Sequence, residues 1–388
     1  MERSRKKLVI CIIVAFFAGS AVTGGICAAV FGGALGYVRV SKSDYDKMSE
    51  SYEKYGKLEQ LYDMIDESYY QKIDEDQVMD GIYKGLVSGL DDPYSSYMSA
   101  VEYDNWKSSA IGEYSGVGVT ISEDEDGNFI VVSVQDDSPA KEGGLKAKDI
   151  IIAIDDKEYD DTETLANAIR GEDGSKVKIT YVRDGEKKDV TLVREKIIQH
   201  SVEHEMLDGN IGYIRIGSFI ESTSDDFKAA LEDIEKQGAE GLVLDLRNNG
   251  GGLVDSCVDI ADEFLDKGLV VYMEDKNGKK KEYKAEEGKT ELKTVVLVNE
   301  ASASASEILA AALKDNGIEL VGQTTYGKGV VQSTAELKDG SALKLTVMQY
   351  FSPKGNAINK VGVEPDYQVK DPEDTKEDEQ LRKALSLF

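Results

Sequence analysis

The longest apolar stretch of the chain lies near its start. Leu8 to Val38 contains no charged residue over 31 positions. Basic residues stand in front of it at Arg3, Arg5, Lys6 and Lys7. This pattern is typical of a membrane-spanning helix with its positive end in the cytoplasm. We therefore expect residues 1–40 to form a cytoplasmic stub and a single-pass membrane anchor, through residues 8–38, with the remainder outside the cytoplasm.

A cleaved signal peptide is the rival interpretation of this stretch. Small residues suited to cleavage occur at Ala18-Gly19-Ser20-Ala21. The apolar run continues well beyond them, which favours an uncleaved anchor in the cell membrane.

After the anchor, the spacing of apolar residues becomes helical over residues 41–110. The positions that carry this spacing are Leu58, Leu61, Met64, Ile65, Val78, Ile82 and Leu86. The stretch includes a turn marked by proline at Leu90-Asp91-Asp92-Pro93-Tyr94-Ser95. We expect a helical N-terminal region here.

Residues 111–196 alternate with the period of strands and predict a β-rich domain with one clear helix. The expected strands are Gly116 to Ser122, Asn128 to Val134, Asp149 to Ile154, Lys176 to Arg183 and Lys188 to Arg194. The helix is expected at Thr162 to Arg170, and hairpin turns at Asp126-Gly127 and Asp184-Gly185.

Residues 197–370 alternate strand and helix, which predicts an α/β core with strands buried on both faces. The strands are Ile211 to Ile216, Gly241 to Leu246 and Thr294 to Val298; the helices are Ser224 to Gln237, Leu253 to Phe264 and Glu307 to Lys314. Residues 371–388 are charged and weakly amphipathic, and we expect a tail helix on the surface.

The composition narrows the range of functions. With 74 acidic against 46 basic residues, the net charge is -28, so nucleic acid is not an expected partner. The three cysteines, at positions 11, 27 and 257, can form neither a disulfide framework nor a cysteine zinc site, and no metal or cofactor is expected. The two histidines, His200 and His204, lie in a polar stretch away from any glycine-rich turn, which does not favour a catalytic role.

A serine-rich run follows a buried strand. Val295 to Asn299 leads into Ala301-Ser302-Ala303-Ser304-Ala305-Ser306-Glu307, where the next helix begins. A serine between a strand end and a helix start has an exposed hydroxyl and free neighbouring N–H groups, as in a nucleophile elbow. The alternative is that Ser304 or Ser306 is a helix N-cap, with Glu307 helping at the helix start.

Lys328 is the candidate base, because burial can leave a lysine neutral near pH 7. It stands between glycines in Thr324-Thr325-Tyr326-Gly327-Lys328-Gly329-Val330-Val331-Gln332. A third element, Asp245-Leu246-Arg247-Asn248-Asn249-Gly250-Gly251-Gly252, ends a strand in three glycines whose N–H groups can point at an oxyanion. Taken alone, this third element is equally consistent with an ordinary turn.

Together these three elements resemble the core motifs of the C-terminal processing peptidases. The motifs at Leu90 to Ser95 and Gly362-Val363-Glu364-Pro365-Asp366 are similar to the flanking signatures of that family, and the likeness runs from about residue 60 to 370. The resemblance implies a crotonase-like α/β peptidase core, here 197–370, carrying an inserted PDZ domain at 111–196. It also implies catalysis by a serine and lysine dyad. With the anchor expected from the apolar run, we expect the protein in the cell membrane of a bacterium.

Carried over by motif, the resemblance implies a role for each site residue. Ser304 is the nucleophile, Lys328 the base, and Gln332 orients the lysine. The oxyanion is held by the N–H groups of Ala305 and Gly251.

The resemblance extends to the start of the PDZ domain. Tyr114-Ser115-Gly116-Val117-Gly118-Val119 is similar to a carboxylate-binding loop, so Gly116, Val117 and Gly118 are expected to bind substrate C-termini. The alternative is a tight turn at a strand start. Arg170 resembles the residue that couples the PDZ domain to the active site in some members.

The sequence thus predicts a membrane-anchored serine endopeptidase that recognises proteins by their free C-termini and cleaves near them. The alternative is a catalytically silent PDZ adaptor at the cell surface. A metal- or polyanion-binding surface protein is the third possibility, but the carboxylates are scattered among lysines as on a solvated face. The oligomeric state stays open, with a homo-oligomer permitted.

Overall fold

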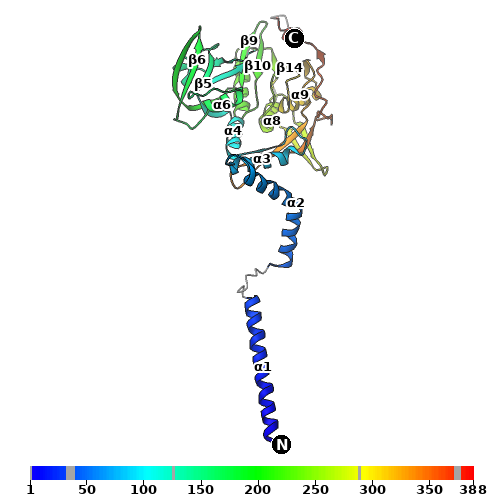
Figure 1. Cartoon of the computed structure of the whole chain (residues 1–388). Helices are drawn as coiled ribbons and strands as arrows, with labels where there is room; N and C mark the ends of the chain where they lie inside the picture. The colour runs from blue at the N-terminus through cyan, green and yellow to red at the C-terminus, as the bar shows by residue number, and fades with distance from the viewer. Residues whose placement is uncertain (1, 32–39, 125–126, 287–289, 371–376) are drawn as a thin grey trace. The chain divides into compact units, whose positions relative to one another are not determined.

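The computed structural model describes residues 2–31, 40–124, 127–286, 290–370 and 377–388 (Figure 1). The protein divides into two compact units, one up to Met79 and the other from Asp80 onward.

The first unit contains α1 (Glu2–Phe31) and α2 (Lys42–Ser68). Within α1, Ser4–Ala28 is long and apolar enough to cross a membrane, and a signal sequence would have the same properties. Residues 32–39, the predicted end of the anchor, lie outside the described part. The helix α2 is capped by Ser41, whose hydroxyl accepts from the Asp44 N–H at 3.1 Å.

The helix α3 (Glu75–Ser88) spans the boundary between the units, and the second unit continues with β1 (Ser96–Met98) and α4 (Ala100–Ile111). The predicted helical N-terminal region thus also contains a short strand, β1, directly after its proline-marked turn. This short strand pairs antiparallel with β17 (Ala342–Phe351), far away in the sequence. Such pairing depends on the distant partner strand and is not visible in the local spacing of apolar residues.

The β-rich domain contains a five-stranded sheet in the order β3-β4-β5-β6-β7. Its strands are β3 (Val119–Glu123), β4 (Phe129–Val134), β5 (Ile150–Ile154), β6 (Lys176–Arg183) and β7 (Glu186–Val193). It also contains α5 (Pro139–Glu142) and α6 (Thr162–Ile169), while β2 (Glu113–Gly116) pairs with β8 (Glu195–Ile198) where the backbone enters and leaves the domain. The predicted strand Gly116 to Ser122 is β3 over most of its length, while Gly116 is the last residue of β2. Asp126 of the predicted hairpin turn lies outside the described residues.

The α/β core is built on a six-stranded sheet in the order β18-β15-β14-β11-β10-β9. Its strands are β9 (Val202–Leu207), β10 (Ile211–Ile216), β11 (Gly241–Asp245), β14 (Lys293–Val298), β15 (Glu319–Gly322) and β18 (Tyr367–Gln368). The pairs from β10 to β18 are parallel, and β9 runs antiparallel to β10. Both faces are buried, as predicted.

Alternate residues of one strand enter different hydrophobic clusters, as a pleated strand requires. Val296 packs with α7 (Thr223–Lys236), α8 (Val254–Asp262) and α9 (Ala305–Asp315). Val295 packs with Ala384 of α10 (Glu379–Leu385) on the other face. The expected surface tail helix is thus part of the core, because Ala384 is fully buried.

A second five-stranded sheet joins β1, β17, β12 (Gly268–Asp275) and β13 (Lys280–Ala285), with β16 (Val330–Glu336) pairing with β17. The strands β16 and β17 run antiparallel. Residues of β16, which follows the glycine and lysine turn, line the same cleft as Ser304, and α9 packs against β12 of this sheet.

Candidate active site

The glycine-rich loop after β11 is held by the side chain of Asn249, which is fully buried. Its Nδ2 donates to the Ile216 carbonyl at 2.9 Å, and its Oδ1 accepts from the Gly251 N–H at 2.8 Å. Gly251 has a φ of 101°, and a Cβ there would lie 2.7 Å from Cβ of Ser304 and 2.9 Å from the Ala305 nitrogen. Glycine is therefore required for the loop to lie against the start of α9.

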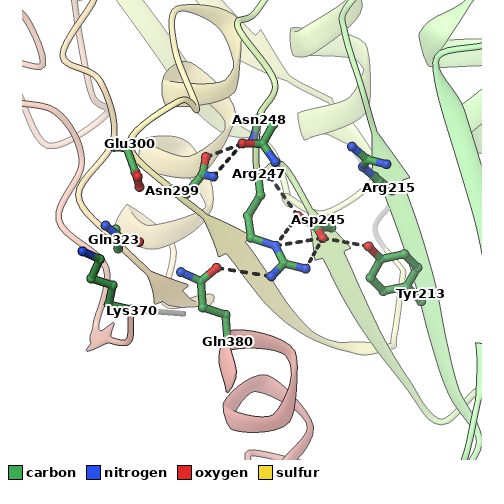
Figure 2. Close-up of a pocket in the computed structure, with 10 residues that line it drawn as sticks. All are labelled: Tyr213, Arg215, Asp245, Arg247, Asn248, Asn299, Glu300, Gln323, Lys370 and Gln380. Atoms are coloured by element: carbon green, nitrogen blue, oxygen red, sulfur yellow. Dashed lines mark hydrogen bonds and ion pairs between the residues drawn. The ribbon is translucent and has the colours of Figure 1, made fainter. Parts of the chain in front are cut away.

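The other side of this loop faces a polar pocket of about 430 Å³ (Figure 2). Arg247 donates from Nη2 to Asp245 at 2.6 Å and to Asp378 at 2.8 Å, and the Tyr213 hydroxyl donates to Asp245 at 2.7 Å. Burial alone would lower the pKa of Arg247, but its bonds to Asp245 and Asp378 raise it. Arg247 thus pairs with both carboxylates and ties the loop to Asp378, the N-cap residue of α10.

Figure 2 also shows Asn248 and Asn299 side by side at one edge of the pocket. The Asn248 N–H donates to Oδ1 of Asn299 at 2.9 Å, and Nδ2 of Asn299 donates to Oδ1 of Asn248 at 2.9 Å. The glycine loop is thereby tied to the loop that leads into the serine run.

The structure distinguishes the three serines of that run. The Ser302 hydroxyl donates to the Leu246 carbonyl at 2.8 Å, and the Ser306 hydroxyl donates to the Asn249 carbonyl at 2.9 Å, both fully buried. Ser304 is partly exposed and has a φ of 57°, a strained conformation of the kind found at functional sites. Two serines thus support the glycine loop, while the middle one, Ser304, is the N-cap of α9, as the alternative expected, and stays partly exposed.

Glu307 joins the serine run to the lysine turn. Its carboxylate is fully buried. One oxygen accepts from the N–H groups of Ser304 and Lys328, both at 2.8 Å, and the other from the Thr325 hydroxyl at 2.6 Å and the Gly327 N–H at 2.7 Å. These four hydrogen bonds set the position of one motif relative to the other.

The lysine turn packs against the segment that follows β17. A Cβ at Gly329 would lie 2.1 Å from the Asn359 nitrogen, so the glycine permits this close approach. The Thr325 hydroxyl accepts from the Val363 N–H at 2.7 Å. Val363 belongs to the second flanking signature, which therefore braces the turn.

The Lys328 side chain is half-buried, and its Nζ lies 4.9 Å from the centre of the Tyr94 ring. Burial lowers the pKa of Lys328, and the nearby cation Lys344 lowers it further, while Glu307 and Asp92 act in the opposite direction. A lysine shifted this way releases its proton more readily than an exposed one.

Tyr350 bridges the backbone of the two candidate catalytic residues. Its buried hydroxyl lies 3.1 Å from the Ser304 carbonyl oxygen and also contacts the Lys328 carbonyl. Burial raises the pKa of Tyr350 well above its ordinary value, so the hydroxyl stays protonated and donates.

Gln332 lies on β16, where its Nε2 donates to the Thr346 hydroxyl on β17 at 3.2 Å. The Thr346 N–H donates to Ser95, and Ser95 donates to Asp92 at 2.6 Å. The first flanking signature therefore supports the strand that holds Gln332. The orientation of Lys328 by Gln332 stays a prediction.

Ser304, Lys328 and Gln332 line one cleft of about 750 Å³, together with Gly250 to Gly252. Aromatic side chains of Tyr103, Trp106, Phe219 and Tyr350 form part of its wall. Both histidines lie elsewhere: His200 is exposed, and Nε2 of His204 lies 2.9 Å from Oδ2 of Asp233. Among described residues, no group of three or more His, Cys, Asp or Glu is arranged to hold a metal.

Comparison with known families agrees with this geometry. Residues 210–369 match the model of peptidase family S41, residues 115–193 that of the PDZ domain, and residues 34–101 that of the activating protease CtpB N-terminal domain.

Curated relatives decide the assignment. The protein is 40% identical over 326 residues to the carboxy-terminal processing protease CtpA of Bacillus subtilis. The matched region covers 82% of this chain and 70% of that protein. The chain belongs to the carboxy-terminal processing proteases of peptidase family S41. It is also 36% identical to a probable CtpA-like serine protease of Staphylococcus saprophyticus, over 84% of this chain and 67% of that protein.

Solved structures of the family share its fold. The photosystem II D1 C-terminal processing protease has a TM-score of 0.51 and 31% identity over 81% of this chain and 86% of its own. A putative S41 protease from Bacteroides fragilis has a TM-score of 0.54 at 18% identity over 82% of this chain and 90% of its own, which shows the fold alone. The protein is thus a serine-type peptidase with a PDZ domain, as the sequence predicted.

The predicted carboxylate-binding loop of this protease lies between β2 and the edge strand β3. The carbonyls of Val117 and Gly118 accept from the N–H groups of Ala140 at 2.8 Å and Gln135 at 2.9 Å. Gly116 ends β2, and the helix α6 packs beside β3. An edge strand next to a helix is the arrangement in which PDZ domains add a peptide strand.

Arg170, the predicted regulatory residue, directly follows α6. Its guanidinium lies 5.1 Å from the centre of the ring of Tyr114, on the strand β2 that leads into this loop. The structure therefore brings Arg170 to the predicted C-terminus-binding loop, while its regulatory role stays a prediction.

Sequence reasoning missed four features of this protease site: Tyr94, Lys344, Tyr350 and the bridging role of Glu307. Tyr94 and Glu307 belong to motifs that the sequence analysis quotes, so their position in those motifs could have predicted that they lie at the site. Lys344 and Tyr350 lie on β17, whose position against β16 comes from strand register and not from local sequence.

Proposed function

We propose that this serine peptidase is a membrane-anchored endopeptidase that cleaves proteins near their C-termini with Ser304 as nucleophile and Lys328 as base. The main observation in support of the dyad is that the backbone N–H groups of Ser304 and Lys328 both donate to one carboxylate oxygen of Glu307, each at 2.8 Å. The lining of a single cleft by both residues adds support. The family assignment favours this enzyme over a silent adaptor.

The reaction follows from these groups. Neutral Lys328 takes the proton of the Ser304 hydroxyl as the serine oxygen attacks the scissile carbonyl carbon. The protonated lysine then gives that proton to the departing amine, and the C–N bond breaks to leave an acyl-enzyme. Water attacks this ester with Lys328 again as base, releasing the acid and restoring Ser304.

The developing oxyanion is held by the N–H groups of Ala305 and Gly251 in this proposal. Proximity supports the pair, since a Cβ at Gly251 would lie 2.9 Å from the Ala305 nitrogen. The Gly251 N–H donates to Asn249 in the structure, so it exchanges this partner for the substrate oxygen during reaction.

Substrate choice by the PDZ domain is the next part of the proposal. The loop Gly116, Val117 and Gly118 holds the terminal carboxylate, and this remote binding energy favours the productive arrangement. A peptide with a free apolar C-terminus is expected to be cleaved faster than its C-terminally amidated twin, and Gly116→Val is expected to narrow the difference. Equal rates for acid and amide in the intact protein would contradict selection by substrate C-termini.

Membrane anchoring through residues 8–38 completes the proposal. The helix Ser4–Ala28, which carries Arg5, Lys6 and Lys7 at its start and no charged residue from Leu8 onward, supports an anchor with the catalytic part outside the cytoplasm. Protease added to intact cells without their wall should degrade the catalytic part. Its survival until the membrane is lysed would refute this orientation.

A further inference from the structure

A second lysine, Lys344, lines the catalytic cleft together with Ser304 and Lys328. It lies on β17, where it pairs with Thr334 of β16. Two residues along both strands towards the lysine turn, and on the same face of the sheet, Thr346 pairs with Gln332. Lys344 and Ala342 stand two residues apart on one strand and so share a face. Ala342 packs with Tyr103 and Trp106, which also line the cleft.

The charges around Lys344 are unusual for this protein. Although the sequence contains 74 acidic residues, the described residues that line the cleft include two lysines and neither Asp nor Glu. The nearby carboxylate of Glu307 is already occupied by four hydrogen bonds. The described lining therefore holds no carboxylate to compete for Lys344, whose ammonium group stands beside an aromatic wall.

We propose that Lys344 is a specificity-determining residue that binds a carboxylate of the substrate inside the catalytic cleft. This inference rests on the proposed function of Ser304. The group that Lys344 binds is a carboxylate of the substrate. It belongs either to a Glu or Asp side chain near the scissile bond or to the free C-terminus. Burial lowers the pKa of Lys344, and a bound carboxylate would offset that cost of desolvation.

A peptide series tests this directly in the full-length enzyme solubilised in detergent. Each peptide carries a single Glu or its isosteric Gln at one position flanking the scissile bond, with the remaining positions neutral. A charge-assisted hydrogen bond predicts a kcat/KM ratio of Glu to Gln of about 10 or more at the matching position. Acid and amide forms of each peptide identify the terminal carboxylate as the alternative source.

Variants assign the preference to the lysine. Lys344→Gln is expected to bring the ratio close to one, and Lys344→Arg to retain most of it. Lys338→Gln is the matched control, because Lys338 is exposed on the turn between β16 and β17 and is expected to keep the ratio. An acid-to-amide difference that persists in Lys344→Gln belongs to the PDZ loop; one that disappears belongs to Lys344.

Two results would overturn the inference. One is a wild-type enzyme whose rates are equal for Glu and Gln at every position and equal for acid and amide. The other is a Lys344→Gln enzyme that keeps the wild-type preference while its pH profile moves, which would assign Lys344 only to the tuning of Lys328. Failure of the proposed function is separate, since it appears as cleavage that survives Ser304→Ala.

Discussion

The buried carboxylate of Glu307 accepts a hydrogen bond of 2.8 Å from the backbone N–H of Lys328, across 21 positions of sequence. The same oxygen accepts from the Ser304 N–H at an equal distance. The nucleophile and the candidate base thus share one anchor, and both donate to it through backbone atoms. Glu307 is a positioning residue in this account.

Replacing Glu307 by Gln should impair both stability and turnover. The amide nitrogen would face N–H groups that now donate to a carboxylate, and hydrogen bonds to a charged group contribute about 1.5–3 kcal/mol each. We expect a lower melting temperature and a kcat reduced at least about tenfold. Glu300→Gln, an exposed change on the preceding loop, is the control. Wild-type kcat in Glu307→Gln would show that the anchor is dispensable.

The pH profile should report Lys328. The base must be neutral, so kcat/KM should rise with pH through the pKa of Lys328, below the ordinary value of lysine. The groups acting on Lys328 are Lys344, Glu307, Asp92 and Tyr94. Because Lys344 lowers the pKa of Lys328, Lys344→Gln should raise the pKa of Lys328. The rise of kcat/KM should then occur at higher pH than in the wild type.

Removal of the base gives the companion measurement. Lys328→Ala should lose at least about 100-fold in rate. The histidine variants His200→Ala and His204→Ala should stay close to wild type, and chelators should have no effect. An enzyme inactivated by either histidine change would need a different base.

The fold was predictable where a pattern is local. The strands β6 and β10 have the predicted bounds, because alternation or a continuous apolar run marks them directly. The strand β13 reads Lys-Lys-Glu-Tyr-Lys-Ala, in which only Tyr283 and Ala285 face the core, too few to mark a strand, and its pairing with β12 holds it in place.

The site was predictable to the extent that motifs contain it. Ser304, Lys328 and Gln332 stand in quoted motifs and line one cleft. The reach of Lys344 and Tyr350 into that cleft depends on the register of β17 against β16, which joins residues through long-range hydrogen bonds. No local sequence pattern encodes that register.

The segment before α10 should stabilise the glycine loop. Arg247→Met would leave Asp245, which is 2% exposed, without its cation, at a cost of about 3–5 kcal/mol in the free energy of unfolding. Asp378→Asn should cost about 1 kcal/mol or less, because that carboxylate is 37% exposed. Denaturant unfolding measures both. An equal effect of the two changes would contradict the central place of Arg247.

The contribution of the Asp378–Arg247 ion pair to stability depends on pH. Burial alone would raise the pKa of Asp378, but its hydrogen bond with Arg247 leaves the pKa below its ordinary value. Its contribution to stability is therefore present above the ordinary carboxyl pKa and is lost as the pH falls through the lowered one.

The identity of the nucleophile is tested most directly by kcat/KM for a peptide with a free C-terminus, followed by mass spectrometry of the products. Ser302→Ala and Ser306→Ala remove hydroxyls bonded to backbone carbonyls, and they should lower the melting temperature while cleavage persists. Ser304→Ala should fold like the wild type and yield no product above the uncatalysed background. Cleavage by Ser304→Ala at the wild-type rate would contradict the account.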